Sequence, residues 1–466
     1  MGSNAPITSL RSSPAASQQI LTNTAVVTPE GSLTPQGLQA LLDSFVPITQ
    51  AFRNASSEQQ VPNDTTTMSP GGSDQFRISS VGLGYELESS HNLEAKLSNT
   101  SSAAITVTVS PFFPLDTLAN TVIQLNGGAT VYSASGIAGF KVAVRRYRGI
   151  LTAILSGHRG PFFNYTSTYT TTAPTIKSTP NGVFSFSGID TISIPANSTV
   201  TLNCDFQTRE PIAKDEVSLI GALMLQNNQT YATCQRQMIG ALVGTTQKFP
   251  FQVASADLVD ITVSGPSKTN QPQLTTETTY DFWALPSDPT LYSDMVATSY
   301  YVTEQPSNAI PNTGSQAVSY NLPQNMILMQ MHFGFMDGNG NYMYPLSNPN
   351  EDNKPDIPRW QLMYNAGVII PVTRFARRER LRQLLLYGGD IGKVPGYLLW
   401  DGSATGPDVN NTDEAGFLDT YFAANPQAKA DVASTVVVSS SSGTAEYSVT
   451  REYLVTSNVQ VLGGAG

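Results

Sequence analysis

Side chains that could carry out catalysis are few in this sequence, and they are scattered. It contains three histidines, His91, His158 and His332, and no His-x-x-x-His, Cys-x-x-Cys, Gly-x-Ser-x-Gly or P-loop motif. Zinc enzymes, α/β-hydrolases and P-loop nucleotide-binding proteins depend on such motifs. We therefore predict that the chain is not an enzyme and has no cofactor. Two carboxylates paired in space, as in a glycosidase, stay an alternative, because sequence spacing does not report such pairs.

One segment is similar to the start of a calcium-binding loop. Asp337-Gly338-Asn339-Gly340-Asn341 has the opening spacing of such a loop. Tyr342 stands where the loop requires glycine, and Asn348 stands where it requires glutamate. We therefore predict a turn at a loop tip and no metal site.

Two basic segments stand out in a chain poor in charge. The first is Arg145-Arg146-Tyr147-Arg148, directly after an expected strand at 139–144, and the second opens a helix expected at 374–387. A solvated strand end is the simpler interpretation of the first segment. Guanidinium groups also suit ion pairs with carboxylates across an interface. The candidate subunit-contact residues are Arg145, Arg146, Arg148, Arg374, Arg377, Arg378 and Arg382.

Composition and charge narrow the classes of partner. The net charge is -10, the pI is near 4.8, and only 13% of the residues are charged. Binding to phosphates needs clustered Lys and Arg, so we predict no direct sequence-specific binding of nucleic acid. Cys204 and Cys234 are too few for a disulfide framework, and we expect two buried thiols.

An amphipathic helix is expected near the N-terminus. Residues 1–31 are rich in Ser, Thr, Ala and Gln without a period, which is typical of an arm that orders on assembly. Ser32 or Thr34 can cap the helix, and Pro47 should kink it. The helix either packs on its own domain or faces a partner or a membrane surface. The apolar residues that we assign to such a partner- or membrane-facing stripe are Leu38, Leu41, Leu42, Phe45 and Phe52.

From residue 76 onward the pattern is that of a β protein. Residues 85–88 and 104–109 alternate with a period of two, and Asn126-Gly127-Gly128 is a strong hairpin signal. The 36 glycines and 30 prolines suit short strands joined by turns. We expect the chain to have four parts: an arm, helix and linker at 1–75, a first β domain at 76–264, a linker at 265–277 and a second β domain at 278–466. The second β domain is expected to carry long exposed loops around 302–356.

Each β domain is expected to carry one helix late in its sequence. In the first domain, Asp215 can cap a helix in which Val217 and Ile220 have helical spacing. In the second, residues 374–387 contain no Gly, Pro or β-branched residue, and Gly388-Gly389 ends the run.

A family resemblance comes from short segments spread over most of the chain and separated by unlike loops. They are Pro211-Ile212-Ala213 with Asp215, then 219–223, then the Arg377-Arg378 helix leading to 395–401, and finally 446–456. In this order they resemble the double jelly-roll major capsid proteins of tectiviruses, which are membrane-containing icosahedral bacteriophages.

The resemblance implies a mainly β fold with two tandem eight-stranded jelly rolls. It also implies a homotrimer of hexagonal outline that tiles the icosahedral shell of a virion, with the chain made in the host cytoplasm. The implied partners are neighbouring trimers, minor capsid and vertex proteins, and an inner viral membrane reached by the N-terminal helix.

Two other classes of protein stay open. A trimeric receptor-binding spike is one, and a carbohydrate-binding or carbohydrate-cleaving β-sandwich is the other. Trp283, Trp360 and Trp400 are the only tryptophans available for a sugar platform. A flat hexagonal trimer would favour the shell subunit, an elongated fibre the spike, and a monomer with a ligand cleft the sugar-binding protein.

Overall fold

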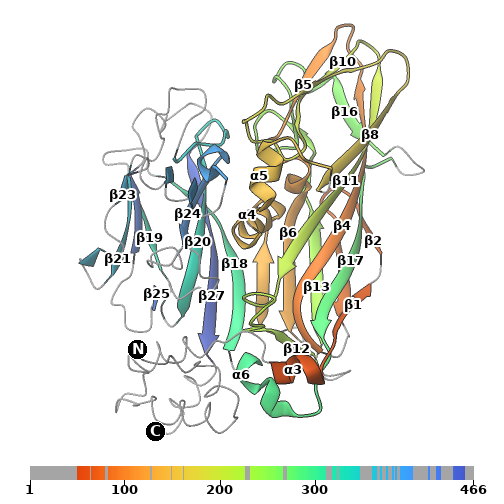
Figure 1. The fold of residues 1–466 in the computed structure, drawn as a ribbon. Coiled ribbons are helices and arrows are strands. Elements are labelled where there is room, and N and C mark those ends of the chain that lie inside the picture. Colours follow the sequence, from red (N-terminus) through yellow and green to blue (C-terminus); the bar gives the residue numbers. More distant parts are fainter. Residues whose placement is uncertain are drawn as a thin grey trace, which may run out of the picture.

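The strands of this chain form two sandwiches that lie side by side (Figure 1). The computed structural model describes residues 50–456 with gaps, of which the longest are 311–316, 347–358, 402–417, 420–426 and 432–443. We call residues 58–283 the first jelly roll and residues 298–456 the second. The double jelly roll implied by the resemblance is thus confirmed.

Long alternating strands build the largest sheet of the first jelly roll. β4 (Gly82–Asn99) lies between β11 (Thr199–Pro211) and β17 (Gln273–Trp283), antiparallel to both. Every second residue of β4 from Leu93 to Leu97 is fully buried, as expected for a strand with one face on a core. The sheet is completed by β1 (Glu58–Pro62), β2 (Thr66–Met68), β8 (Phe163–Tyr169), β12 (Leu223–Leu225) and β16 (Ile261–Ser264).

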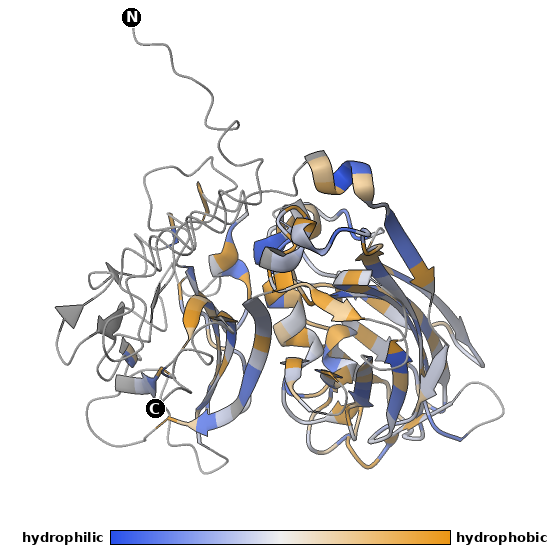
Figure 2. Ribbon diagram, turned by 90° about the horizontal axis from the view of Figure 1, so that it is seen from below, coloured by the Kyte–Doolittle hydropathy of each residue, from blue (hydrophilic) through white to orange (hydrophobic). Residues whose placement is uncertain are grey.

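Two further sets of strands cover the inner face of this sheet. One set is the five-stranded sheet of β5 (Ile105–Val109), β9 (Thr175–Ser178), β10 (Ile189–Ile194), β14 (Val243–Gly244) and β15 (Phe251–Gln252). The other is β3 (Ser73–Ile78), β6 (Leu118–Leu125), β7 (Thr130–Ala134) and β13 (Ala232–Met238). Apolar side chains from all three sets form the core, and Figure 2 shows hydrophobic residues along these strands.

The second jelly roll is built around one almost wholly buried strand. β20 (Ile327–Met336) lies between β24 (Tyr397–Asp401) and β27 (Glu446–Thr456), and β27 pairs in turn with β18 (Thr298–Ala309). Its core packs this sheet against Tyr320 and Ala428 of the facing sheet. The remaining strands are β19 (Ala317–Asn321), β21 (Arg359–Tyr364), β22 (Val368–Ile369), β23 (Arg374–Phe375), β25 (Leu418–Asp419) and β26 (Gln427–Asp431).

A single sheet runs through both jelly rolls. β18 pairs in parallel with β7, with Val302 opposite Tyr132 and Thr303 opposite Ser133. The strands from β24 to β3 therefore belong to one nine-stranded sheet. Shared backbone hydrogen bonds hold the two halves in one orientation.

Short helices lie at the ends of the strands and between the sheets. α4 (Gly136–Arg146) and α5 (Gly149–Leu155) lie on the first jelly roll, and α3 (Gln50–Ala55) and α6 (Ser293–Val296) lie at one end of the molecule (Figure 1). The 3-10 turns are η2 (Leu115–Thr117), η3 (Pro289–Leu291) and η4 (Ile391–Lys393).

The helix of the first jelly roll differs from the sequence prediction. Residues 139–144, predicted as a strand, belong to α4, because Ser135 caps it by accepting a hydrogen bond from the Ala138 amide at 3.2 Å. The helix predicted from Asp215 is wrong: the Asp215 carboxylate caps a single turn. Leu219 and Gly221 follow with φ of 54° and 74°, outside the α-helical region, and the chain enters β12.

The second predicted helix starts later than expected. Arg374 and Phe375 form β23, paired with β21, instead of a first helical turn. Residues 380–381 and 384–385 are helical, and the rest of 376–388 lies outside the described residues.

The expected domain boundaries and loops also need correction. β17 pairs along β4, so the chain leaves the first jelly roll after Trp283 and not at 265–277. β1 and β2 lie within the expected linker before residue 76. Residues 302–356, expected as loops, contain most of β18 and all of β19 and β20. Residues 311–316 and 347–358 lie outside the described residues, so their predicted exposure stays a prediction.

Candidate functional site

Helix α4 occupies the contact between the two jelly rolls. At its start, Glu304 of β18 accepts a hydrogen bond from the Ser135 amide at 2.7 Å. A carboxylate at a helix N-terminus is favoured by the helix dipole. The second jelly roll therefore supplies the anion that completes a helix of the first.

The other end of α4 enters a buried polar cluster. Arg145 Nε lies 3.7 Å from Asp401 Oδ2 of β24, and both side chains are about one-twentieth exposed, at 6% and 5%. Gln330 of β20 lies between Arg145 and Glu452 of β27. With its amide oxygen toward Arg145, it accepts from Arg145 Nη2 at 2.6 Å and donates to Glu452 Oε1 at 3.1 Å. We call Arg145, Gln330, His332, Asp401 and Glu452 the seam cluster.

The histidines lie apart from one another. His332 Nε2 is 3.0 Å from Glu452 Oε1 in the seam cluster, and its Nδ1 is 2.7 Å from the Tyr397 hydroxyl, so both ring nitrogens have a polar partner. His91 lies inside the first jelly roll between two threonine hydroxyls at 2.8 Å each. Burial lowers the pKa of His91 well below its usual range, so this ring is neutral. His158 lies on the surface.

A buried lysine lies beside the seam cluster. Lys141 of α4 is 6% exposed, and its Nζ lies 5.4 Å from the Tyr397 ring centroid and 5.9 Å from that of Phe112. Burial lowers the pKa of Lys141 to about 8, and the nearby Glu304 opposes this change. Cation–π contact to one ring from each jelly roll compensates part of its lost hydration.

Arg145 and Arg146, two of the basic residues at 145–148, make contacts within the chain. Arg145 joins the two jelly rolls of one chain, so its assignment as a subunit contact is wrong. Arg146 Nη1 donates to the Ala213 carbonyl at 2.7 Å, also within the first jelly roll. Arg148 lies outside the described residues, as do Arg377, Arg378 and Arg382; Arg374 is placed only as a backbone position in β23.

The apolar stripe of the N-terminal helix is described only at its end. Phe52 of α3 is fully buried, with its ring centroid 5.6 Å from that of Trp283. It belongs to a small cluster of the first jelly roll itself, so its assignment to a partner-facing stripe is wrong. Leu38, Leu41, Leu42 and Phe45 lie outside the described residues. Within the part of the chain that is described, no helix is long and apolar enough to cross a membrane.

The segment Asp337–Asn341 is a turn, as predicted. Asp337 Oδ1 accepts from the amides of Asn339 and Asn341 at 2.9 and 2.8 Å. The turn packs on the first jelly roll, because the Gln247 amide donates to the Gly340 carbonyl at 3.1 Å and Gln247 Oε1 accepts from the Tyr342 amide at 2.9 Å. It is a second point of contact between the two jelly rolls.

Sequence reasoning missed the partners of Arg145. The available signal was the run at 326–336, which is apolar except for Gln330, His332 and Gly334. Polar side chains on one face of an otherwise apolar strand indicate a buried polar contact. Cys204 and Cys234 are both buried free thiols, as predicted.

Two sandwiches joined by one sheet and a buried seam define a double jelly-roll protein. No protein-family model matches the sequence, and the search of curated proteins finds no match. Among solved structures, the chain is similar to the major capsid protein of Sulfolobus turreted icosahedral virus, with a TM-score of 0.49 and 14% identity over 88% of this chain and 99% of that one. For the Faustovirus major capsid protein, the TM-score is 0.47 and the identity is 8%, over 94% of this chain and 97% of that one. For the major capsid protein P2 of bacteriophage PM2, the TM-score is 0.40 and the identity is 8%, over 86% of this chain and 97% of that one.

Proposed function

We propose that this chain is a major capsid protein, a structural subunit of an icosahedral viral shell. The observation that carries the proposal is the fusion of two jelly rolls into one body by a shared sheet and by the seam cluster. A shell subunit needs its two jelly rolls in a constant relative orientation, because each copy must contact its neighbours in the same way. A polar network buried between the halves provides that constancy.

Three copies arranged about one axis would present six jelly rolls in a hexagonal outline, which can tile a closed surface. An apolar surface suited to such a contact lies on the second jelly roll. Leu381, Leu384 and Leu385 are 58%, 40% and 73% exposed, and contiguous exposed apolar side chains mark interaction surfaces. Neighbouring trimers, minor capsid proteins and vertex proteins would complete the shell of the virion.

The trimer is tested by native mass spectrometry and negative-stain imaging of the full chain. We expect a trimer of hexagonal outline. Leu381→Asp with Leu385→Asp should dissociate it, whereas Val259→Asp should not, because Val259 is 82% exposed but lies on a turn of the first jelly roll. A stable monomer of the unmodified chain at micromolar concentration would refute the trimer.

The N-terminal segment is proposed to face an inner viral membrane. The support comes from its sequence, because Leu38, Leu41, Leu42 and Phe45 form an apolar stripe at helical spacing. Burying such a stripe contributes several kcal/mol per copy at about 25 cal/mol per Å², and many copies act together on one shell.

Deletion of residues 1–49 tests the membrane assignment. The deletion stops short of α3 and so keeps Phe52. We expect an intact trimer that no longer binds anionic lipid vesicles, and the same loss, in milder form, from Leu41→Asp with Leu42→Asp. A deleted chain that binds vesicles as well as the full chain would exclude this role.

A further inference from the structure

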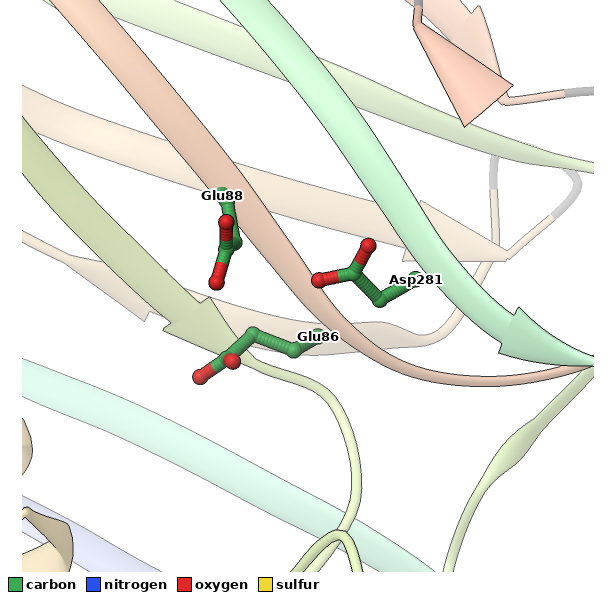
Figure 3. Close-up of side chains that lie close together, drawn as sticks. All are labelled: Glu86, Glu88 and Asp281. Carbon is green, nitrogen blue, oxygen red and sulfur yellow. The ribbon is translucent and has the colours of Figure 1, made fainter. Parts of the chain in front are cut away.

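Three carboxylates gather at one end of the large sheet of the first jelly roll. Glu86 and Glu88 lie on β4, and Asp281 lies directly opposite Glu86 on β17. One oxygen of each carboxylate lies within 4.8 Å of the others. Figure 3 shows the Asp281 carboxylate pointing into the space between the two strands, toward Glu86 and Glu88.

Two of the three carboxylates already have partners. Arg209 Nη1 lies 2.9 Å from Glu86 Oε2, and Arg209 Nη2 lies 2.5 Å from Glu88 Oε1. Tyr147 donates its hydroxyl hydrogen to Glu86 Oε1. Burial raises the pKa of Glu86, while the charges of Arg146 and Arg209 oppose the change. The guanidinium group of Arg209 is thus shared by Glu86 and Glu88.

The third carboxylate is buried and incompletely hydrogen-bonded. Asp281 is only 2% exposed, and no hydrogen-bond donor among the described residues reaches its Oδ1. Its side chain accepts a hydrogen bond from Gln60, which leaves Oδ1 without a donor. A buried carboxylate oxygen without a donor is costly and calls for a positive partner.

The arrangement has the chemistry of a hard-cation site. Calcium takes oxygen ligands at about 2.3–2.6 Å in flexible geometry, so two ligand oxygens up to about 4.8 Å apart can share one ion. The Glu88 side chain is 35% exposed, which leaves a route from solvent and room for water ligands. Magnesium, with its strict octahedral geometry, suits this unequal set less well.

We propose that Glu86, Glu88 and Asp281 bind a divalent cation of the calcium type that joins β4 to β17. β17 is the last strand of the first jelly roll before the chain crosses to the second. β1 pairs with β17, with Gln60 opposite Asp281, so the same ion would stabilise the attachment of the N-terminal segment.

Terbium luminescence tests the site on the full chain after treatment with a chelator. Tyr147 touches Glu86 and can sensitise a terbium ion bound there. We expect saturable emission that calcium displaces, and a rise in Tm on adding calcium. Asp281→Asn should weaken terbium binding at least tenfold and abolish the calcium-dependent rise in Tm. Glu277→Gln is the matched control, because it removes one exposed charge from β17 outside the cluster and should change neither quantity.

Glu88→Gln provides a second variant, because this partly exposed residue can be replaced with little effect on the core. It should also weaken terbium binding at least tenfold if Asp281→Asn fails to fold. The proposal is overturned if millimolar calcium leaves the Tm unchanged and terbium emission is absent. It is equally overturned if either variant binds terbium as tightly as the unmodified chain.

Discussion

Replacing Arg145 by methionine should show how much the seam cluster contributes to the free energy of unfolding, apart from the core of each jelly roll. The change keeps most of the buried apolar volume and removes the guanidinium. Asp401 and Glu452, 4% and 3% exposed, would then lose their positive neighbour inside the protein. Breaking a buried ion pair by removing one partner costs about 3–5 kcal/mol. At 3.7 Å and an effective dielectric constant of about 20, the direct attraction alone is on the order of 4 kcal/mol.

Urea unfolding followed by circular dichroism and tryptophan fluorescence measures the effect. We expect Arg145→Met to lower the free energy of unfolding by about 3–5 kcal/mol. Trp400, next to Asp401 on β24, reports on the seam, and Trp283 reports on the first jelly roll. Combining Arg145→Met with Asp401→Leu should cost less than the sum of the single changes, because both charges then leave together.

The control for this experiment is an ion pair that crosses the same contact at the surface. Lys248 Nζ lies 2.9 Å from Glu446 Oε2, with side chains 44% and 33% exposed. Lys248→Met should cost less than about 1 kcal/mol, as exposed pairs do. If Arg145→Met costs no more than Lys248→Met, or if the double variant is strictly additive, the seam cluster does not stabilise the docking of the two jelly rolls.

Three further predictions concern the first jelly roll. Phe52→Ala should lower the free energy of unfolding by about 3–5 kcal/mol, because it empties a site against Trp283; a thermal melt with less than a 1 °C change would contradict this. Gly221→Ala should lower the free energy of unfolding by more than about 1 kcal/mol, because a Cβ there would lie 2.5 Å from the Tyr300 amide nitrogen and the residue has a φ of 74°. An unchanged Tm in the same melt would be inconsistent with this geometry. Burial raises the pKa of Asp116 to about 7 from 3.8, so its contribution to stability is complete below about pH 4 and is lost as the pH rises through 7. Urea titrations give the free energy of unfolding of the unmodified chain minus that of Asp116→Asn. This difference should fall by about 4 kcal/mol from pH 4 to pH 8, and the same difference at both pH values would exclude the pKa shift.

The fold class could be predicted from the sequence because strand alternation is a local property. Residues 85–88 show it and lie within β4, and residues 104–109 show it and all but the first of them form β5. The α4 segment reads as a strand, because its β-branched Ile137, Val142 and Val144 favour strands and its glycines disfavour a helix, and only Ser135 indicates a helix start. Asp215 is a correct capping residue, but residue type does not reveal the positive φ at Leu219, which ends the capped segment after one turn.

The seam cluster could not be predicted because its members lie far apart in the chain. Arg145 was identified as a contact residue from its neighbours in sequence. Its partner Asp401 follows it by more than 250 residues, and only the register of β20 against β24 and β27 brings the two together. Long-range register depends on tertiary packing, and no local pattern encodes it.

The last of the described strands, β27, has a central position in the second jelly roll. β27, at residues 446–456, lies between β18 and β20 and pairs along both. During synthesis, β18 and β20 leave the ribosome well before the strand that joins them, so this half of the molecule folds late and through contacts distant in sequence. A chain terminated before residue 446 would leave two unpaired strand edges and could not close the sheet that both halves share. Synthesis of β27 is thereby a condition for a closed second jelly roll, and a chain that stops before this strand is marked by its own failure to fold.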